Sequence, residues 1–241
     1  MEKRALLYEG KAKMVYQVDD PDLCLIYFKD SATAFNAQKK GEIAEKGALN
    51  NAISAHFFAL LAKEGVESHF IRSLSQREML VRRLEIIKIE VVVRNIVAGS
   101  LAKRFGWPEG AVLAEPIIEY YYKDDSLGDP LVNDDHLRVL NLATAAELAT
   151  ITRLSKQVNG VLKDYLETKN ILLVDFKLEF GRSLGKIILG DEISPDTCRF
   201  WDATTKEKLD KDRFRRDLGQ VAEAYREILE RLQGGQDSVQ G

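Results

Sequence analysis

A segment that passes from an apolar run into strict alternation restricts the fold of this chain more than any other. Residues 171–174 are continuously apolar, and residues 175–180 then read DFKLEF. A period of two residues is typical of a β-strand whose two faces meet different surroundings. Asp175, Lys177 and Glu179 therefore share one face, and the opposite face is apolar. Burying the acidic face is costly unless a cationic group satisfies it.

The alternating strand is predicted to turn back on itself as a hairpin. Residues 181–183 end the alternation, so residues 185–189 can return as an antiparallel partner, paired about Ser183 or Leu184. Asp191 then lies beside the charged face. Two or three carboxylates next to a lysine suit a Mg²⁺ ion that keeps several waters and is completed by nucleotide phosphates. The lysine can neutralise a phosphoryl group during its transfer.

A hairpin at the edge of a sheet explains the same alternation without any ligand, because its charged face would simply meet water. The next acidic cluster, GDEISPD at residues 190–196, favours the metal site, since it holds more acidic residues than a turn requires. The pattern alone leaves both interpretations open.

Composition excludes several classes of protein. The 241 residues include 35 Lys and Arg against 38 Asp and Glu, with no long block of one sign, so nucleic acid is not the expected partner. Cys24 and Cys198 lie far apart and neither belongs to a CxxC motif, which fits a reducing cytoplasm. No apolar stretch approaches the roughly 20 residues that span a bilayer, so no membrane partner is expected.

Apolar periodicity predicts an α+β chain whose first part is a small lobe over residues 1–85. Residues 4–29 alternate as three short antiparallel strands, and residues 43–63 repeat at helical steps as an amphipathic helix packed across them. Two further strands are expected at residues 69–74 and 78–84.

A larger lobe is expected over residues 86–241. It would begin with a β-branched strand that reaches Gly99 and Ser100 and is followed by a short helix. The other expected elements are a strand near residues 117–122, a long polar loop at 123–136, a helix that starts at the Thr144-x-x-Glu147 capping box and ends near residue 170, the hairpin, a last helix over residues 210–232, and a disordered tail at 233–241.

Four cationic residues in three segments can meet anionic ligands, and each also has a purely structural interpretation. Lys11 and Lys13 lie in a strand–turn–strand, YEGKAKMVY, that lacks the P-loop and GxGxxG patterns and can equally be an exposed basic turn. Arg94 lies inside an apolar strand, so it must meet either a ligand phosphate or a carboxylate such as Glu90. Arg199 is either a stacked core arginine or a substrate clamp.

Seven strings in the same order along the chain resemble one family, SAICAR synthetase (phosphoribosylaminoimidazole-succinocarboxamide synthase) of purine biosynthesis. Nearly the whole chain is covered. Two positions depart from the family pattern, Lys88 where many relatives carry Pro and Ser31 where an acidic residue is frequent, and neither is a proposed ligand. The strings are EGKAKMVY, FKDSATAFNAQKKGEI, IEVVVRNIVAGS, KDDSLGDPLVND, LVDFKLEFG, GDEISPDTCRFWD and the closing helix.

The resemblance implies an ATP-dependent amide-forming ligase. It would join L-aspartate to the carboxylate of 5-amino-1-(5-phosphoribosyl)imidazole-4-carboxylate, with ADP and phosphate as the other products. It also implies a two-lobed fold related to protein kinases and ATP-grasp enzymes, with antiparallel sheets, packed helices and a C-terminal helix. A requirement for Mg²⁺, a cytoplasmic location and a homodimer belong to the same expectation.

The resemblance also assigns roles to individual residues. The expected metal ligands are Glu179 and Asp191, and the expected nucleotide contacts add Lys11, Ala12, Lys13, Met79, Val81 and Arg82. The phosphoribosyl substrate would contact Arg94, Ser100 and Arg199, while Asp175, Lys177 and Lys13 would act on the reacting groups. In the polar loop, Lys123, Asp129 and Asn133 are candidates for closing over substrate.

Two other functions fit parts of the pattern. A kinase that phosphorylates a hydroxyl would have similar lobes and metal carboxylates, but it needs a base in an HRD-like loop, which the sequence lacks. A nucleotide-binding module without activity would use the acidic hairpin only as structure. No GxSxG elbow or Cys–His pair is present, so no covalent enzyme intermediate is expected.

Overall fold

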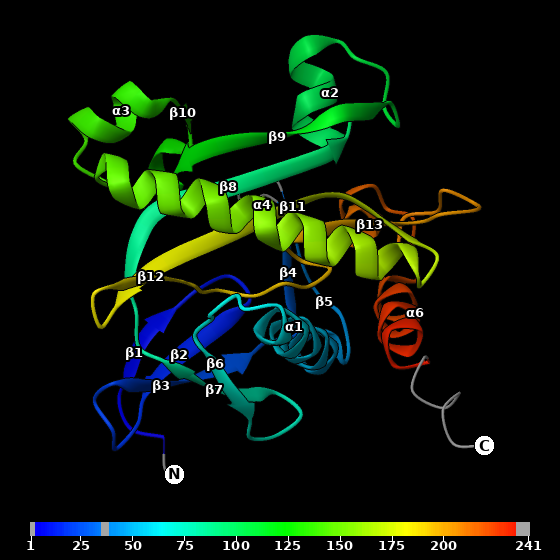
Figure 1. Ribbon diagram of the computed structural model, residues 1–241. Coiled ribbons are helices and arrows are strands. Elements are labelled where there is room, and N and C mark those ends of the chain that lie inside the picture. The colour runs from blue at the N-terminus through cyan, green and yellow to red at the C-terminus, as the bar shows by residue number, and fades with distance from the viewer. Residues whose placement is uncertain (1–2, 35–38, 235–241) are drawn as a thin grey trace.

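Two antiparallel β-sheets and the helices between and around them build the protein (Figure 1). The computed structural model describes residues 3–34 and 39–234. The predicted α+β class is confirmed. The expected disorder of residues 233–241 falls mainly outside the described residues, and the last helix reaches Gln233.

The first sheet contains the three N-terminal strands that alternation predicts, and all three are antiparallel. Its strands are, in spatial order, β1 (Leu6–Glu9), β2 (Lys13–Gln17), β3 (Leu23–Phe28), β7 (Glu78–Arg82) and β6 (Phe70–Ser73). A separate hairpin joins β4 (Ser31–Ala34) to β5 (Lys39–Glu42).

Only two residues separate β7 from β8 (Glu85–Ile96), the first strand of the second sheet along the chain. Its strands are, in order, β10 (Leu131–Val132), β9 (Val112–Tyr122), β8 (Glu85–Ile96), β11 (Ile171–Ser183) and β12 (Lys186–Leu189), and β13 (Cys198–Asp202) also pairs with β11. The change of sheet lies where the sequence predicts a boundary between lobes, and the independence of the two lobes stays a prediction.

The predicted hairpin is confirmed, and its turn lies where the sequence places it. Ser183 pairs with Lys186, so Leu184 and Gly185 form a two-residue turn in which both residues have positive φ, 49° and 75°. β11 is not an edge strand, because it pairs with β8 on one side and with β12 and β13 on the other. Since Asp175 and Glu179 are also buried, the alternative of a solvent-facing edge hairpin is wrong.

Helices cover both sheets. The long helix α4 (Ala145–Glu167) crosses β8 and β11, and α1 (Lys46–Lys63) contacts the first sheet, α4 and the C-terminal helix (Figure 1). No helix of the described residues is long and apolar enough to cross a membrane. The remaining helices are α2 (Gly99–Phe105), the 3-10 turn η1 (Asp125–Leu127), α3 (Asp134–Val139), α5 (Asp212–Arg215) and α6 (Val221–Gln233).

Two local predictions need correction. The helix expected to be amphipathic, α1, is buried around most of its circumference, including Phe57, Phe58 and Asn51, because α6 packs on the side that faces away from the sheet. The segment expected as a polar loop holds η1, β10 and the start of α3. Its Asn133 side chain caps α3 by accepting from the His136 backbone N–H at 3.1 Å.

The capping box at the start of α4 gives a stability prediction. The Thr144 hydroxyl accepts from the Glu147 backbone N–H at 3.2 Å, and the Glu147 carboxylate accepts from the Thr144 N–H at 2.8 Å. Thr144→Ala should lower the free energy of unfolding by about 1 kcal/mol in urea titrations, because it leaves a helical N–H without its acceptor. Thr144→Ser keeps the hydroxyl and should unfold like the wild type; equal destabilisation by both changes would contradict this role.

Candidate active site

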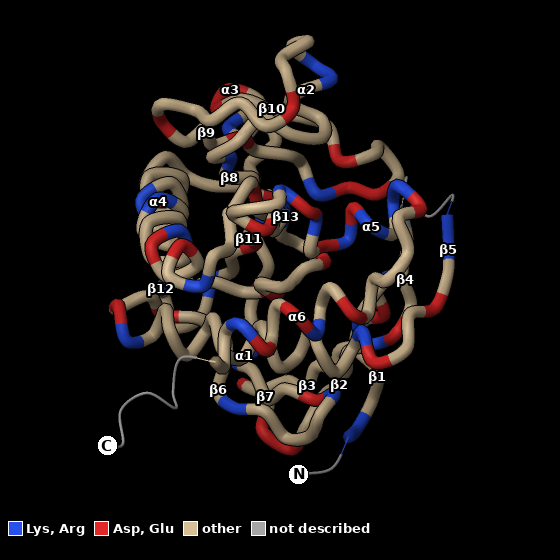
Figure 2. Tube along the Cα trace, turned by 90° about the vertical axis from the view of Figure 1, so that its right-hand side faces the viewer, with Lys and Arg blue, Asp and Glu red and all other residues tan. Residues whose placement is uncertain are grey.

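A cavity of about 470 Å³ opens on the charged face of β11. It brings together six of the residues singled out from the sequence, which are Arg94, Ser100, Asp129, Asp175, Lys177 and Arg199. Its walls also include Glu90, Tyr121, Asp196 and Arg215, which had no predicted ligand role. In Figure 2 basic and acidic positions are interleaved along the strands and the α5 turn that surround this region.

Arg94 projects from β8 into a nearly complete shell of acceptors. Its side chain is 3% exposed, and it donates to Glu119 at 2.8 Å, to Asp175 at 2.9 Å and to the Ser100 hydroxyl at 2.8 Å. Burial alone would lower the pKa of Arg94, but the Asp175 and Glu119 carboxylates outweigh burial and raise it. The sequence suggested Glu90 as the carboxylate partner of Arg94. The partners are instead Glu119 and Asp175, and Glu90 contacts Lys177.

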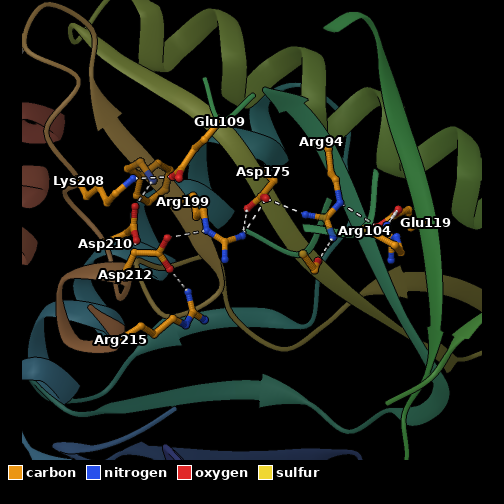
Figure 3. A network of polar contacts seen from close by, with 12 residues as sticks. Arg94, Arg104, Glu109, Glu119, Asp175, Arg199, Lys208, Asp210, Asp212 and Arg215 are labelled. Atoms are coloured by element: carbon orange, nitrogen blue, oxygen red, sulfur yellow. Dashed lines mark hydrogen bonds and ion pairs between the residues drawn. The ribbon is translucent and has the colours of Figure 1, made fainter. Parts of the chain in front are cut away.

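Asp175 bridges two arginines at the centre of this wall (Figure 3). Its Oδ1 and Oδ2 accept from Arg199 Nη1 at 2.9 and 2.8 Å, and Oδ2 also accepts from Arg94. Arg199 also donates to Asp212 at 2.9 Å. A side chain at Gly99, whose φ is +54°, would come within 2.5 Å of Arg199 Nη2, so only glycine leaves room for this guanidinium.

Lys177 lies beside this bridge and gathers the second group of charges. Its ammonium is 2.8 Å from Glu90, 2.7 Å from Glu179 and 3.8 Å from Asp191. Burial alone would lower the pKa of Lys177, but Glu179, Asp191 and Glu90 raise it well above its usual value. Lys123 donates to the same Glu179 oxygen at 2.7 Å.

Lys13 reaches this group of charges from the first sheet. It pairs with Asp191 and lies 2.9 Å from Glu192. Burial alone would raise the pKa of Asp191, but Lys13, Lys177 and Lys123 lower it. A strand of the first sheet and the segment that follows the hairpin of the second sheet therefore meet at these ion pairs.

Other predicted nucleotide contacts lie on the first sheet, outside the cavity lining. Lys11 is paired with Asp125 at 2.6 Å on the surface, and the Ala12 carbonyl accepts from the Lys29 N–H at 2.8 Å. Met79 and Val81 are buried in β7 and Arg82 is exposed. Their roles remain predictions.

The carboxylates of Glu179 and Asp191 are directed toward the same cationic group, the Lys177 ammonium. This arrangement is compatible with binding a divalent cation between them. Among residues 3–34 and 39–234, however, no group of three or more His, Cys, Asp and Glu side chains could hold a metal ion. An ion here would need further ligands, such as phosphate oxygens and water, and Mg²⁺ commonly takes both.

Among the charged residues that the sequence did not predict are Glu119 and Asp212, which bind Arg94 and Arg199, and Arg215, which lines the cavity. Glu119 is the single charge in the run IIEYYY, and a charge inside an apolar strand next to the strand of Arg94 could have been found. The segment KDRFRRD around Asp212 and Arg215 gives no such signal, because charged residues are common on exposed turns.

Comparisons with known proteins show the family of the chain. The model of the family described as SAICAR synthetase matches residues 6–232. The chain belongs to the SAICAR synthetase family. Phosphoribosylaminoimidazole-succinocarboxamide synthase of Brevibacillus brevis is 59% identical over 235 residues, which cover 97% of this chain and 98% of that protein. The same enzyme of a Thermoanaerobacter species is 57% identical over 234 residues, 97% of this chain and 100% of that protein.

Solved SAICAR synthetases share the fold. The crystal structure of phosphoribosylaminoimidazole-succinocarboxamide synthase from Ehrlichia chaffeensis has a TM-score of 0.93 at 46% identity and covers 95% of this chain and 98% of its own. A SAICAR synthetase in complex with ADP has a TM-score of 0.92 at 52% identity and covers 94% of this chain and 97% of its own. The predicted family and the antiparallel α+β fold are both confirmed.

The central carboxylate yields a prediction about stability. Asp175→Asn should lower the free energy of unfolding by about 3 kcal/mol or more in chemical denaturation, because it removes the charge that two largely buried guanidiniums share. Asp135→Asn is the control: its ion pair with Arg138 is on the surface, with the Asp135 side chain 73% exposed, and its effect should stay within about 0.5 kcal/mol. Similar losses of unfolding free energy in the two variants would mean that the buried bridge stabilises the fold no more than a surface ion pair does.

Proposed function

We propose that the chain is an ATP-dependent ligase that joins L-aspartate to the carboxylate of 5-amino-1-(5-phosphoribosyl)imidazole-4-carboxylate, giving SAICAR for purine biosynthesis. The observation that carries the proposal is a single cavity with three arginines, a lysine and a nearby pair of carboxylates. The family membership, and relatives named for this reaction over nearly their whole length, support it.

The chemistry explains why so much charge is needed. An unactivated carboxylate resists amide formation because its oxygen is a poor leaving group, so we infer that ATP first phosphorylates it. The aspartate amine then attacks the acyl carbon and phosphate leaves. Three anionic reactants must share one cleft, and Lys177, Arg94 and Arg199 offset their charge from side chains that are buried or partly buried.

The nucleotide and its metal ion are assigned to the group of charges around Lys177. Glu179 and Asp191 would hold Mg²⁺, which would neutralise the phosphates of ATP. Lys13 and Lys123 already neutralise these carboxylates and can turn to phosphate oxygens instead. Lys11, Ala12 and the β7 residues Met79, Val81 and Arg82 would form the rest of the nucleotide contact. A relative solved with ADP supports nucleotide binding.

Asp175 is a positioning residue in this proposal. Both of its oxygens accept hydrogen bonds from arginines, so it sets the separation of Arg94 and Arg199. A substrate or phosphate oxygen, which carries more negative charge as phosphate leaves, is a better acceptor for the amine proton. Asp129 and Ser100 complete the substrate contacts in the cavity, and Lys123 would contact substrate from its edge.

The cellular compartment and the oligomeric state of the protein are proposed mainly from the family resemblance. We propose a cytoplasmic homodimer that binds neither nucleic acid nor membrane. Both cysteines, Cys24 and Cys198, are free and buried, which suits a reducing compartment.

A coupled assay of ADP release tests the proposed reaction. Release should require both the imidazole carboxylate and L-aspartate, and the succinocarboxamide should form in equal amount. ADP release without aspartate would indicate a kinase, and no release at all would indicate a binding module.

The carboxylate pair gives a prediction about turnover. Glu179→Ala should lower kcat by roughly a hundredfold or more, because one stabilising charge at the phosphates is lost. Glu85→Ala removes an exposed carboxylate from the same sheet and should leave kcat unchanged. Thermal unfolding curves establish that both variants are folded. Near-normal turnover of Glu179→Ala at saturating Mg²⁺ would contradict the metal assignment.

A further inference from the structure

The ammonium group of Lys13 is held by two neighbouring carboxylates, and the proposed function gives a role to only one of them. Lys13 pairs with Asp191, which is assigned to the metal ion, and its Nζ lies 2.9 Å from Glu192 Oε1. Burial alone would lower the pKa of Lys13, but the charges of Asp191 and Glu192 outweigh burial and raise it. Glu192 thus helps to keep this lysine charged, although it takes no part in the proposed reaction.

The two carboxylates differ in their surroundings. The Asp191 side chain is 17% exposed, and a second ammonium group, Lys177 Nζ, lies 3.8 Å from it. The Glu192 side chain is 3% exposed, and among residues 3–34 and 39–234 Lys13 is its only ion-pair partner. If Lys13 left, Glu192 would be a buried charge without a counter-charge, which is strongly unfavourable. The lysine is therefore bound more firmly to Glu192 than to Asp191.

The Glu192 carboxylate is also fixed in place by its own segment. Its Oε2 accepts from the Ser194 hydroxyl at 2.6 Å, and the Ser194 oxygen in turn accepts from the Asp196 backbone N–H at 3.1 Å. Ile193, between them, is fully buried, and its carbonyl accepts from the Ser54 hydroxyl of α1 at 3.1 Å. The carboxylate therefore has little freedom to follow its partner if that partner moves.

We infer that Glu192 is a positioning residue that keeps the Lys13 ammonium at the phosphate end of the nucleotide site when Asp191 turns to the metal ion. This inference rests on the proposed function and adds to it a residue that the predicted ligand set does not contain. With Glu192 present, Asp191 can release the lysine without leaving it unpaired. Without Glu192, Asp191 would be the one carboxylate partner left to Lys13 among the described residues, and a metal ion would have to displace the ammonium.

Calorimetric titration of ADP at a series of Mg²⁺ concentrations tests this role without relying on turnover. In Glu192→Gln, the Mg²⁺ concentration that gives half-maximal ADP affinity should rise about tenfold, since the metal ion must break a charge-assisted hydrogen bond between Lys13 and Asp191. Ser194→Ala keeps every charge and removes the hydroxyl that fixes Glu192. It should shift the same midpoint in the same direction by a smaller factor, which keeps the test decisive if Glu192→Gln does not fold.

A double variant separates positioning of the lysine from simple loss of a negative charge near the metal ion. In the Lys13→Met background the ammonium is absent, so the further change Glu192→Gln should move the Mg²⁺ midpoint by less than about twofold. If Glu192→Gln shifted the midpoint about tenfold in that background as well, Glu192 would act directly through its charge, and the positioning role would be wrong.

Asp202→Asn is the matched control. Asp202 is also a buried carboxylate with one cationic partner, since its side chain is 8% exposed and Arg231 donates to it at 2.7 Å, but it lies outside the cavity lining. Its replacement should lower the midpoint of thermal unfolding, because it leaves Arg231 without that carboxylate charge. The Mg²⁺ midpoint for ADP binding should stay unchanged.

An unchanged Mg²⁺ midpoint in both Glu192→Gln and Ser194→Ala would overturn the inference, as would an equal shift in Asp202→Asn. A wild-type ADP affinity that does not depend on Mg²⁺ would overturn it too. Failure of the proposed function looks different, because wild-type protein would then release no ADP in response to aspartate.

Discussion

The carboxylate of Asp175 is the point on which the charged wall depends. It lies on the central strand of the second sheet and holds guanidinium groups from the strands on either side, Arg94 of β8 and Arg199 of β13. From there the contacts continue through Glu119 to β9 and through Asp212 to α5. One buried acid thus fixes the distance between two cations that would otherwise repel each other in a medium of low dielectric constant. In the proposed function, that distance would set the spacing of the substrate groups that the two arginines contact.

The neighbouring group of charges around Lys177 works in a different way. Here three lysines face the carboxylates of Glu179 and Asp191, and the lysine side chains are long enough to change partners. The carboxylates are neutralised before any ligand arrives, so their burial is tolerated. Exchange of an ammonium for a metal ion, and of a carboxylate for a phosphate, then costs little net electrostatic energy. In the proposed function, the arginines with several fixed hydrogen bonds contact the substrate, and the longer, more flexible lysines contact the nucleotide.

Local pattern predicted much of this structure. The alternation of residues 175–180, the Leu184–Gly185 turn and the capping box at Thr144 act over a few residues, so the sequence displays them directly. The pairing of Arg94 with Glu119 depends on the register of β8 against β9, which no local signal fixes. Burial all round α1 depends on α6, which lies more than a hundred residues later. Arg215 of α5 is likewise brought to the cavity only by the complete fold.

The apolar core has a consequence for motion. A single cluster of buried side chains runs from Phe28 and Met79 of the first sheet, through Phe57 of α1, to Phe176 of β11 and Ile228 of α6. Since α1 is enclosed by elements from both ends of the chain, the two sheets cannot rotate apart about a hinge without opening that cluster to water. In the proposed function, closure around a nucleotide would therefore proceed by small shear displacements between packed helices and by rotamer changes.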